Sequence, residues 1–237
     1  MKLILTKKPK NVTIIEGFPG FGLVGTISAE FLIEHLECEE IGSIFLNDIP
    51  AMVAIHANKV IQPIGIYYNK KYNIVFIYGI TVIQGIEWKI VDAILELAKK
   101  LKAKEIINLE GVGSTNTREN QRVFYYSNNS KKVKQFDELG LTRMKEGIIM
   151  GVTGAMLYKG KRKITNTCLF AETSSNMPDS GAAAKVIRVL DQYLGLKVDY
   201  KPLLQQAEKF EGKVKDILSK GQVAMSDTQK KQMSYVG

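Results

Sequence analysis

Short apolar runs of the length of a β-strand alternate along this chain with segments in which apolar residues recur at helical spacing. The pattern predicts strands at residues 12–15, 41–46, 52–57, 61–68, 74–78, 106–109, 123–126 and 167–171. It predicts helices at residues 23–36, 86–101, 131–139, 147–158 (after an initial loop) and 182–194. Asn69 to Lys71 are typical of a hairpin tip, so part of the sheet is expected to be antiparallel. Alternation of strands and helices predicts one three-layer α/β/α domain with a mixed sheet.

The sequence changes character beyond residue 198. A last helix is expected over residues 199–221, because Pro202 suits a first helical turn and apolar residues then follow in steps of 4, 3, 4 and 3. These apolar positions are Leu203, Ala207, Phe210, Val214 and Ile217. The helix is expected to pack either on its own domain or on another subunit. We therefore divide the chain into a domain at 1–198, a helix at 199–221 and a flexible polar tail at 222–237.

Composition sets the broad class of the protein. The chain has 237 residues, of which 45% are hydrophobic, and a formal charge of +9. Its Lys and Arg residues are spread along the chain, so we expect them on solvated faces and regard nucleic-acid binding as unlikely. The first residues are too short an apolar stretch for a signal peptide, and no run has the length of a membrane span. Cys38 and Cys168 are far apart and outside any C-x-x-C pattern, which fits reduced thiols and a cytoplasmic location.

A glycine-rich stretch at residues 17–25 raises the question of a cofactor. Gly20, Gly22 and Gly25 form a G-x-G-x-x-G pattern between an expected strand and an expected helix. In a dinucleotide-binding loop the first glycine directly follows the strand, and an acidic residue ends the next strand. Asp48 roughly meets the second condition, but Gly17 rather than Gly20 follows the strand, and Pro19 removes a backbone donor. We therefore expect no bound cofactor, and no metal site, since His35 and His56 do not pair by spacing.

We interpret the glycines as elements of folding and of assembly. Glycines permit a tight reversal of the chain and a close approach of the helix to the sheet. Phe18 and Phe21 look exposed, and we expect them to contact a neighbouring subunit. The predicted structural or oligomer-forming loop comprises Gly17, Phe18, Pro19, Gly20, Phe21, Gly22 and Gly25.

Polar residues gather at the expected carboxyl ends of strands, where ligand sites of open α/β sheets lie. The carboxylates are Glu16, Asp48, Glu110 and Glu172. The loop at 111–122 adds Ser114, Thr115, Arg118 and Arg122, and the loop at 172–181 adds Ser174, Ser175, Asn176 and Asp179. Arg118 or Arg122 could bind a phosphate, and Glu110 or Glu172 could act as a general base. An enzyme is disfavoured, because no serine lies in a nucleophile elbow and no histidine is placed as a base. Asp179 or Ser180 also has a structural explanation, since either suits a helix cap.

Three stretches carry a resemblance to a known family. EGFPGFGLVGTISAEFLIEHL (16–36) resembles the opening signature of the PAC2 family of proteasome assembly chaperone-like proteins. EGIIMGVTGAMLYKG (146–160) resembles the family's glycine-rich loop and helix. Residues 170–211 resemble its C-terminal half, with E-T, P-D and A-A in the family's spacing. The resemblance extends in order over about residues 10 to 215.

The resemblance implies a fold similar to that of purine nucleoside phosphorylase without the catalytic set of that enzyme. It implies a cytosolic, archaeal-type protein that is not an enzyme, forms homo-oligomers, and binds proteasome α-subunits or the 20S core particle. Family members also work with a PAC2 paralogue. The leading alternative is a nucleoside- or phosphate-binding enzyme that uses the loop at 111–122.

Some family members end in a hydrophobic-Tyr-any tripeptide that enters pockets between α-subunits. This chain departs from that pattern, because Tyr235 is third from its end and Ser234 precedes it. A flexible tether, an aromatic anchor and a terminal carboxylate are all present. The predicted partner-binding segment is Met233, Ser234, Tyr235, Val236 and Gly237.

Overall fold

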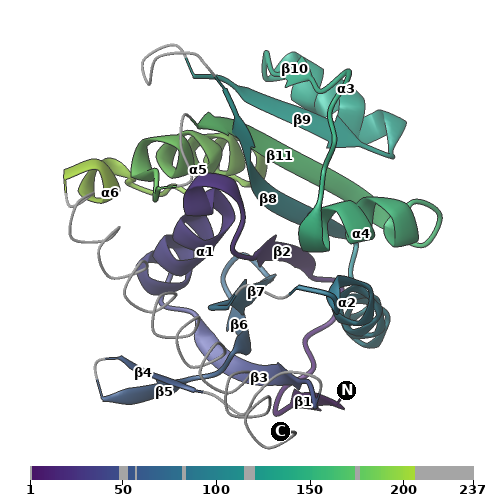
Figure 1. The fold of residues 1–237 in the computed structure, drawn as a ribbon, viewed down its shortest axis with the longest axis vertical. Helices are drawn as coiled ribbons and strands as arrows, with labels where there is room; N and C mark the ends of the chain where they lie inside the picture. Colours follow the sequence, from purple (N-terminus) through teal and green to yellow (C-terminus); the bar gives the residue numbers. More distant parts are fainter. Residues whose placement is uncertain are drawn as a thin grey trace, which may run out of the picture.

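A nine-stranded mixed sheet with helices on both faces forms the body of the protein (Figure 1). The computed structural model describes residues 2–47, 53–56, 58–81, 84–114, 121–173 and 177–205. The strand order is β1-β3-β6-β7-β2-β8-β11-β9-β10, and β4 and β5 form a separate two-stranded sheet. The strands are β1 (Lys2–Leu5), β2 (Thr13–Gly17), β3 (Glu39–Phe45), β4 (Ala54–His56), β5 (Lys59–Ile61), β6 (Ile64–Asn69), β7 (Ile74–Gly79), β8 (Glu105–Gly113), β9 (Val123–Ser127), β10 (Thr142–Arg143) and β11 (Thr165–Thr173). This arrangement confirms the predicted mixed α/β architecture.

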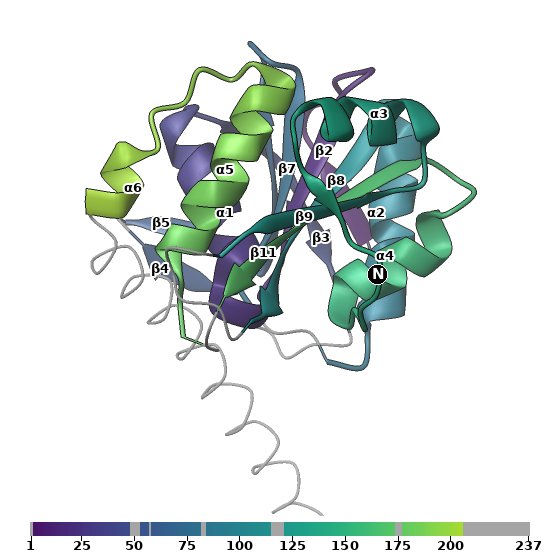
Figure 2. The same cartoon turned by 90° about the horizontal axis from the view of Figure 1, so that it is seen from above.

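The helices form one layer on each side of the sheet. They are α1 (Val24–His35), α2 (Glu87–Leu101), α3 (Ser130–Glu138), α4 (Gly151–Gly160), α5 (Ser180–Leu194) and α6 (Lys201–Gln205), with a short 3-10 turn η1 (Phe21–Leu23) before α1. Figure 2 shows α1 and α5 on one side of the sheet and α2 and α4 on the other. The sheet centre, β7-β2-β8-β11, is parallel, whereas β1, β3, β6 and β7 pair antiparallel.

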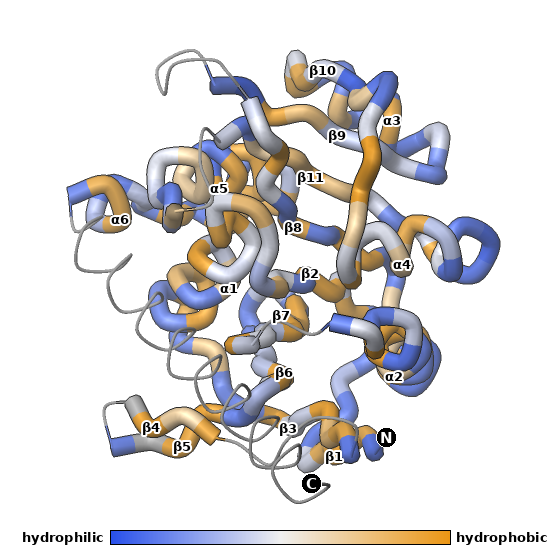
Figure 3. The backbone as a smooth tube through the Cα atoms, in the orientation of Figure 1, coloured by the Kyte–Doolittle hydropathy of each residue, from blue (hydrophilic) through white to orange (hydrophobic). Residues whose placement is uncertain are grey.

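The core consists of two clusters, one on each face of the sheet. Ile15 of β2 lies in the cluster beneath α1 and α5, and its neighbour Ile14 lies in the cluster beneath α2 and α4. Successive side chains of a strand point to opposite faces. A strand covered on both sides therefore reads as a continuous apolar run, which is why the central strands were predictable from the sequence. The apolar stretches of the central strands run through the middle of the molecule in Figure 3.

The structure corrects one strand prediction and adds two strands. The run at 61–68 is not one strand, because it is split at Gln62 and Pro63 into β5 and β6, which belong to different sheets. Pro63 has no N–H to donate, so it suits a break between strands. The short edge strands β1 and β10 were not predicted, since four and two residues carry little pattern. The hairpin tip at 69–71 is confirmed by the antiparallel pairing of β6 with β7.

The predicted division of the chain is described only up to Gln205. Helix α6 begins at Lys201 and buries Leu203. The remainder of the expected helix and the tail at 222–237 lie outside the described residues, so the boundaries at 198 and 221 stay predictions.

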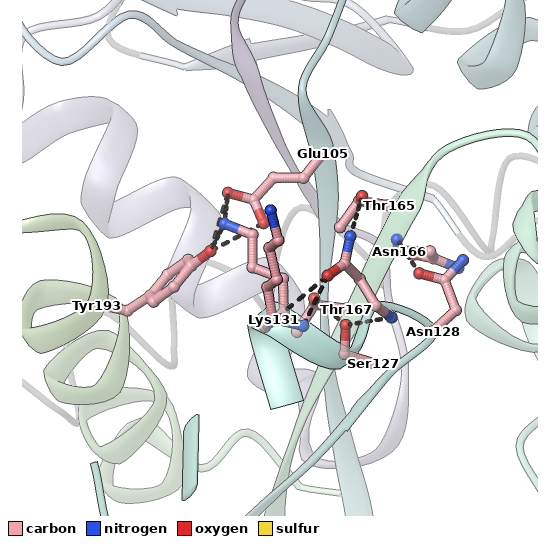
Figure 4. A network of polar contacts seen from close by, with 10 residues as sticks. Glu105, Ser127, Asn128, Lys131, Thr165, Asn166, Thr167 and Tyr193 are labelled. Carbon is pink, nitrogen blue, oxygen red and sulfur yellow. Dashed lines mark hydrogen bonds and ion pairs between the residues drawn. The ribbon is translucent and has the colours of Figure 1, made fainter. Parts of the chain in front are cut away.

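A polar network fixes α3 and α5 to the amino end of the parallel strands (Figure 4). Glu105, the first residue of β8, is buried, and its carboxylate accepts hydrogen bonds from the Tyr193 hydroxyl at 2.9 and 3.0 Å and from the Lys132 ammonium at 3.2 Å. The Thr167 hydroxyl donates to that of Ser127 at 3.0 Å. A buried carboxylate with two partners costs far less than an unpaired one, so the network stabilises this end of the sheet.

Candidate functional site at the carboxyl ends of the strands

A cavity of about 780 Å³ lies at the carboxyl ends of the parallel strands, opposite to the network around Glu105. This size is typical of ligand pockets, and the position is the one expected for a site in an open α/β sheet. The cavity is lined by the glycine loop, the ends of β8 and β11, β9, residues between β7 and the start of α2, and the segment that leads into α4 with its first turn. Its lining residues include Phe18, Pro19, Gly20, Phe21, Glu87, Glu110, Phe124, Met144, Glu146, Ile149, Val152, Thr153 and Glu172.

Contacts with β8 and α1 require the glycines of the loop. A Cβ atom at Gly17 would lie 2.3 Å from the carbonyl oxygen of Gly25, and one at Gly25 would lie 2.3 Å from that of Leu109. Gly22 has φ of +62°, and Leu23, with φ of +51°, is also left-handed. The glycines therefore let α1 approach the sheet closely and let the chain reverse before it.

A carboxylate fills the place that a dinucleotide-binding loop offers to a phosphate. A Cβ atom at Gly20 would lie only 2.0 Å from Oε1 of Glu110. The backbone N–H of Phe21 donates to the same Glu110 side chain. The backbone N–H of the loop and the space beside Gly20 are therefore both occupied by the Glu110 carboxylate. This geometry disfavours a dinucleotide site, in which the pyrophosphate would take that place.

The predicted exposure of Phe18 is wrong. Phe18 is only 8% exposed, and its ring packs on the backbone of Gly79, where a Cβ atom would lie 2.5 Å from Cδ1 of Phe18. The ring is buried because the loop folds back over the end of β7. Phe21 is half-buried and lines the cavity. A contact with a neighbouring subunit through Phe21 stays a prediction.

Glu110 joins the glycine loop to α4. Its Oε2 accepts a hydrogen bond from the Thr153 hydroxyl at 3.0 Å, and its Oε1 accepts one from the backbone N–H of Gly111 at 3.2 Å. These bonds favour the ionised form, but loss of solvent outweighs them and raises the pKa of Glu110 to about 7. The position matches the prediction of a carboxylate at a strand end, and a pKa near neutrality is typical of functional sites.

Glu16 lies one strand away from Glu110 and is almost completely buried. It is 1% exposed, and neither of its carboxyl oxygens has a hydrogen-bond partner among the described residues. Burial, with a smaller contribution from the charge of Glu110, raises the pKa of Glu16 to about 8. Its register partner Asn108 carries a buried Oδ1 atom that also lacks a partner. Burial of a carboxyl without a hydrogen-bond partner favours its neutral form.

Glu172 and Arg122 form a pair, which changes their predicted roles. Oε2 of Glu172 accepts the backbone N–H of Arg122 at 2.8 Å, and Oε1 accepts Nη2 at 3.2 Å. The Arg122 guanidinium also lies 4.8 Å from the centre of the Phe124 ring. The guanidinium is thus already engaged by a carboxylate, which disfavours phosphate binding by Arg122.

Other predicted site residues have structural positions or fall outside the described part. Asp179 caps α5, since its Oδ1 accepts the N–H of Ala182 at 3.0 Å and its Oδ2 accepts the Thr173 hydroxyl at 2.8 Å. This confirms the predicted cap. The backbone N–H of Ser114 donates to the carbonyl of Thr173 at 2.9 Å. Asp48, Thr115, Arg118, Ser174, Ser175, Asn176 and the segment from Met233 to Gly237 lie outside the described residues.

Exposed apolar side chains at the cavity were not predicted from the sequence. Ile148 is 93% exposed, and Met150, which precedes the first residue of α4, is also exposed. Outside the cavity lining, Trp88 of α2 and Tyr158 of α4 are also exposed and make an edge-to-face contact with ring centres 5.8 Å apart. The sequence did contain a signal for this feature, namely the apolar run I-I-M at 148–150 just before a predicted helix.

The fold and the site define a three-layer α/β protein with a cavity at the strand ends, in which the loop glycines hold a carboxylate. The sequence model of the PAC2 family matches residues 14–218, and the chain belongs to this family. This confirms the resemblance noted in the sequence.

Two solved structures and one further relative illustrate the similarity. The chain is similar to Pyrococcus furiosus PbaA, an archaeal homolog of proteasome-assembly chaperone, with 31% identity, a TM-score of 0.85, and 94% of this chain and 98% of that chain covered. Pyrococcus furiosus PbaB, an archaeal proteasome activator, shares the fold, with 21% identity, a TM-score of 0.76, and 91% and 98% covered. An uncharacterized protein of Methanocaldococcus jannaschii is 26% identical over 231 residues, covering 96% of this chain and 94% of the relative. In the described ranges, none of the helices has the length and apolar composition needed to span a membrane.

Proposed function

We propose that this protein is a proteasome assembly chaperone-like protein, cytoplasmic, that forms a homo-oligomer and binds proteasome α-subunits or the 20S core particle. The observation that supports it most is the similarity to PbaA over 94% of the chain, at 31% identity. Because that similarity covers nearly the whole of both chains, it concerns the complete domain rather than a shared motif. A PAC2 paralogue is a further partner consistent with the family.

The surface beside the cavity supports a binding role. Ile148, Met150 and Tyr158 are strongly exposed, and Trp88 is half exposed. We call this set the rim patch. Exposed apolar patches mark interaction sites, and Trp, Tyr and Met are among the residues enriched in protein interfaces. Binding of another protein would bury the rim patch and remove its apolar side chains from water.

The C-terminal segment is the second proposed contact. Met233 to Gly237 include one aromatic residue, Tyr235, and end in a carboxylate. A pocket with a lysine at its base would bind such an end by burying the ring and pairing the carboxylate. The shift of Tyr235 by one position from the family pattern makes its removal the direct test of this contact.

The alternative of a nucleoside- or phosphate-handling enzyme receives less support. Arg122 is paired with Glu172, and the donors of the glycine loop serve Glu110. Arg118 is the remaining candidate for binding a phosphate. A thermal shift with phosphate or a nucleoside that Arg118→Ala abolishes would favour this alternative.

Native mass spectrometry with archaeal proteasome α-subunits tests the proposal. We expect a defined complex with the full chain, weakened when residues 233–237 are deleted and unchanged in Ser226→Ala, a control in the same tail but outside this segment. A complex that survives the deletion would leave the chaperone proposal in place and assign the contact to the folded domain. The absence of any complex with α-subunits or with the 20S particle would refute the proposal.

A further inference from the structure

The β4–β5 hairpin carries apolar side chains on both of its faces. Ala54 and Ile61 face the body of the protein and pack on the cluster that contains Tyr78. On the opposite face Ile55 lies directly across from Val60, and Ile55 is 76% exposed. In an antiparallel hairpin with one face in water, that face is normally polar. The pattern is instead that of a hairpin covered on both sides.

The outer face of the hairpin forms a contiguous patch. Ile55 and Val60 are cross-strand neighbours, and Val53, which directly precedes β4, is more than half exposed. We call these three residues the hairpin patch. A two-stranded hairpin is only marginally stable by itself, so packing on its outer face would stabilise it.

The chain beyond Gln205 contains a segment that needs such a surface. Helix α6 buries Leu203, which is 1% exposed, so this side of the helix faces the body of the protein. The apolar seam continues from Leu203 in helical steps at Ala207, Phe210, Val214 and Ile217. Polar residues such as Glu208 and Lys215 occupy the other sides, so the segment has a single apolar face to bury.

The hairpin patch is an exposed apolar surface on the same side of the sheet as α6. Figure 2 shows α6 with β4 and β5 on one side of the sheet, and α4, which carries Tyr158 of the rim patch, on the other. Twelve further helical residues, 206–217, extend about 18 Å at 1.5 Å per residue. This length exceeds the width of one helix, about 10 Å.

We propose that residues 206–217 form an amphipathic helix that docks its apolar seam onto the hairpin patch of the same chain. The direct connection through α6 gives the segment a high effective concentration at this surface, which favours the same chain over a second copy. Docking covers the outer face of the hairpin and leaves residues 222–237 as the tether of the C-terminal segment. The inference does not depend on the proposed function.

Site-directed cross-linking in the full-length chain tests the contact. In a Cys38→Ala background, the pair Ile55→Cys and Phe210→Cys is treated with a short bismaleimide at several protein concentrations. Cys168 remains, because it is completely buried. We expect a cross-link within one chain that forms at least tenfold faster than in the control pair Ile55→Cys and Glu208→Cys, where position 208 lies on the opposite side of the helix. Equal rates for the two pairs, or products that link two chains, would overturn the proposal.

Hydrogen exchange provides a second measurement that does not require cysteines. Phe210→Ser with Ile217→Ser removes the seam, and Glu208→Ser with Lys215→Ser is the control on the polar side. We expect the amides of β4 and β5 to exchange at least tenfold faster in the seam variant than in the control, whereas those of the central strand β8 stay unchanged. Unchanged exchange in the hairpin would refute the contact, and protection that depends on protein concentration would assign it to a second copy.

Discussion

Replacing Glu16 by Gln should make the protein more stable, and increasingly so as the pH rises. Glu16 is buried on β2 without a hydrogen-bond partner among the described residues, and its pKa is raised from 4.5 to about 8. A carboxyl whose folded-state pKa lies above its unfolded value contributes stability only while it is protonated. This contribution is complete below about pH 4.5 and is lost as the pH rises through about 8.

The size of the effect follows from the shift. The difference between 4.5 and about 8 is roughly 3.5 units, which at about 1.4 kcal/mol per unit sets an upper limit of about 5 kcal/mol on the free energy of unfolding. Local relaxation and water entry lower this limit, so we expect ~2–3 kcal/mol between about pH 5 and about pH 9. Gln is permanently neutral and nearly isosteric, so it removes the cost of ionising a buried group at this position.

Urea unfolding followed by circular dichroism, at several pH values and protein concentrations, measures this difference. The expected result is that the free energy of unfolding of Glu16→Gln minus that of the wild type increases from pH 5 to pH 9 with unchanged m-values. Glu96→Gln is the control, because Glu96 is half exposed and pairs with Lys100 on the surface of α2. A difference that does not change with pH would refute the assignment of a raised pKa to Glu16.

Three further variants test other parts of the structure. Gly20→Ala should lower the melting temperature by several degrees, because its Cβ atom would meet the Glu110 carboxylate at 2.0 Å. Gly147→Ala is the control, because the nearest neighbour of its Cβ atom would be the Met144 sulfur at 3.6 Å, an ordinary contact. Tyr193→Phe should lower the free energy of unfolding by ~1–3 kcal/mol, since a buried carboxylate loses a donor, and an unchanged denaturant midpoint would contradict the network. Met150→Ser should leave the melting temperature within about 1 °C and weaken binding of α-subunits, measured by titration; equal affinity would remove Met150 from the rim patch's role.

Much of the fold was predictable because its central strands are covered on both faces. The run at 74–78 is hydrophobic throughout, and the run at 106–109 is apolar apart from Asn108; both are strands at the predicted positions. Helix α2 was equally clear, because its apolar residues recur at one face over 15 residues. The split at Pro63 was not predictable, because both halves are apolar. A single run of apolar residues does not show to which sheet each half belongs.

The candidate site was predictable in position but not in its pairing. The sequence places Glu16, Glu110 and Glu172 at strand ends, and the structure brings them to one edge of the sheet. The sequence alone does not indicate that Glu172 pairs with Arg122 or that Glu110 fills the space beside Gly20. These contacts join segments about 50 and 90 residues apart. Burial of Phe18 was hidden for the same reason, since the groove that receives it is created by Gly79 of another strand.

The raised pKa values and the glycine contacts have a common physical origin in the close approach of the loop to β8. Bringing Gly20 within contact of Glu110 excludes water from that carboxyl, and the same packing leaves Glu16 behind it without solvent. A phosphate ligand at this position would face carboxylates rather than cations. At lower pH a neutral Glu110 would remain hydrogen-bonded to Thr153. The glycines that resemble a nucleotide-binding loop therefore build a carboxylate-filled edge of the sheet, and Ile148 and Met150 are exposed beside it. Glu110→Gln separates these roles: it retains the bond to Thr153, so in an assembly chaperone it should leave binding of α-subunits unchanged, whereas in an enzyme that uses Glu110 as a base it should abolish activity.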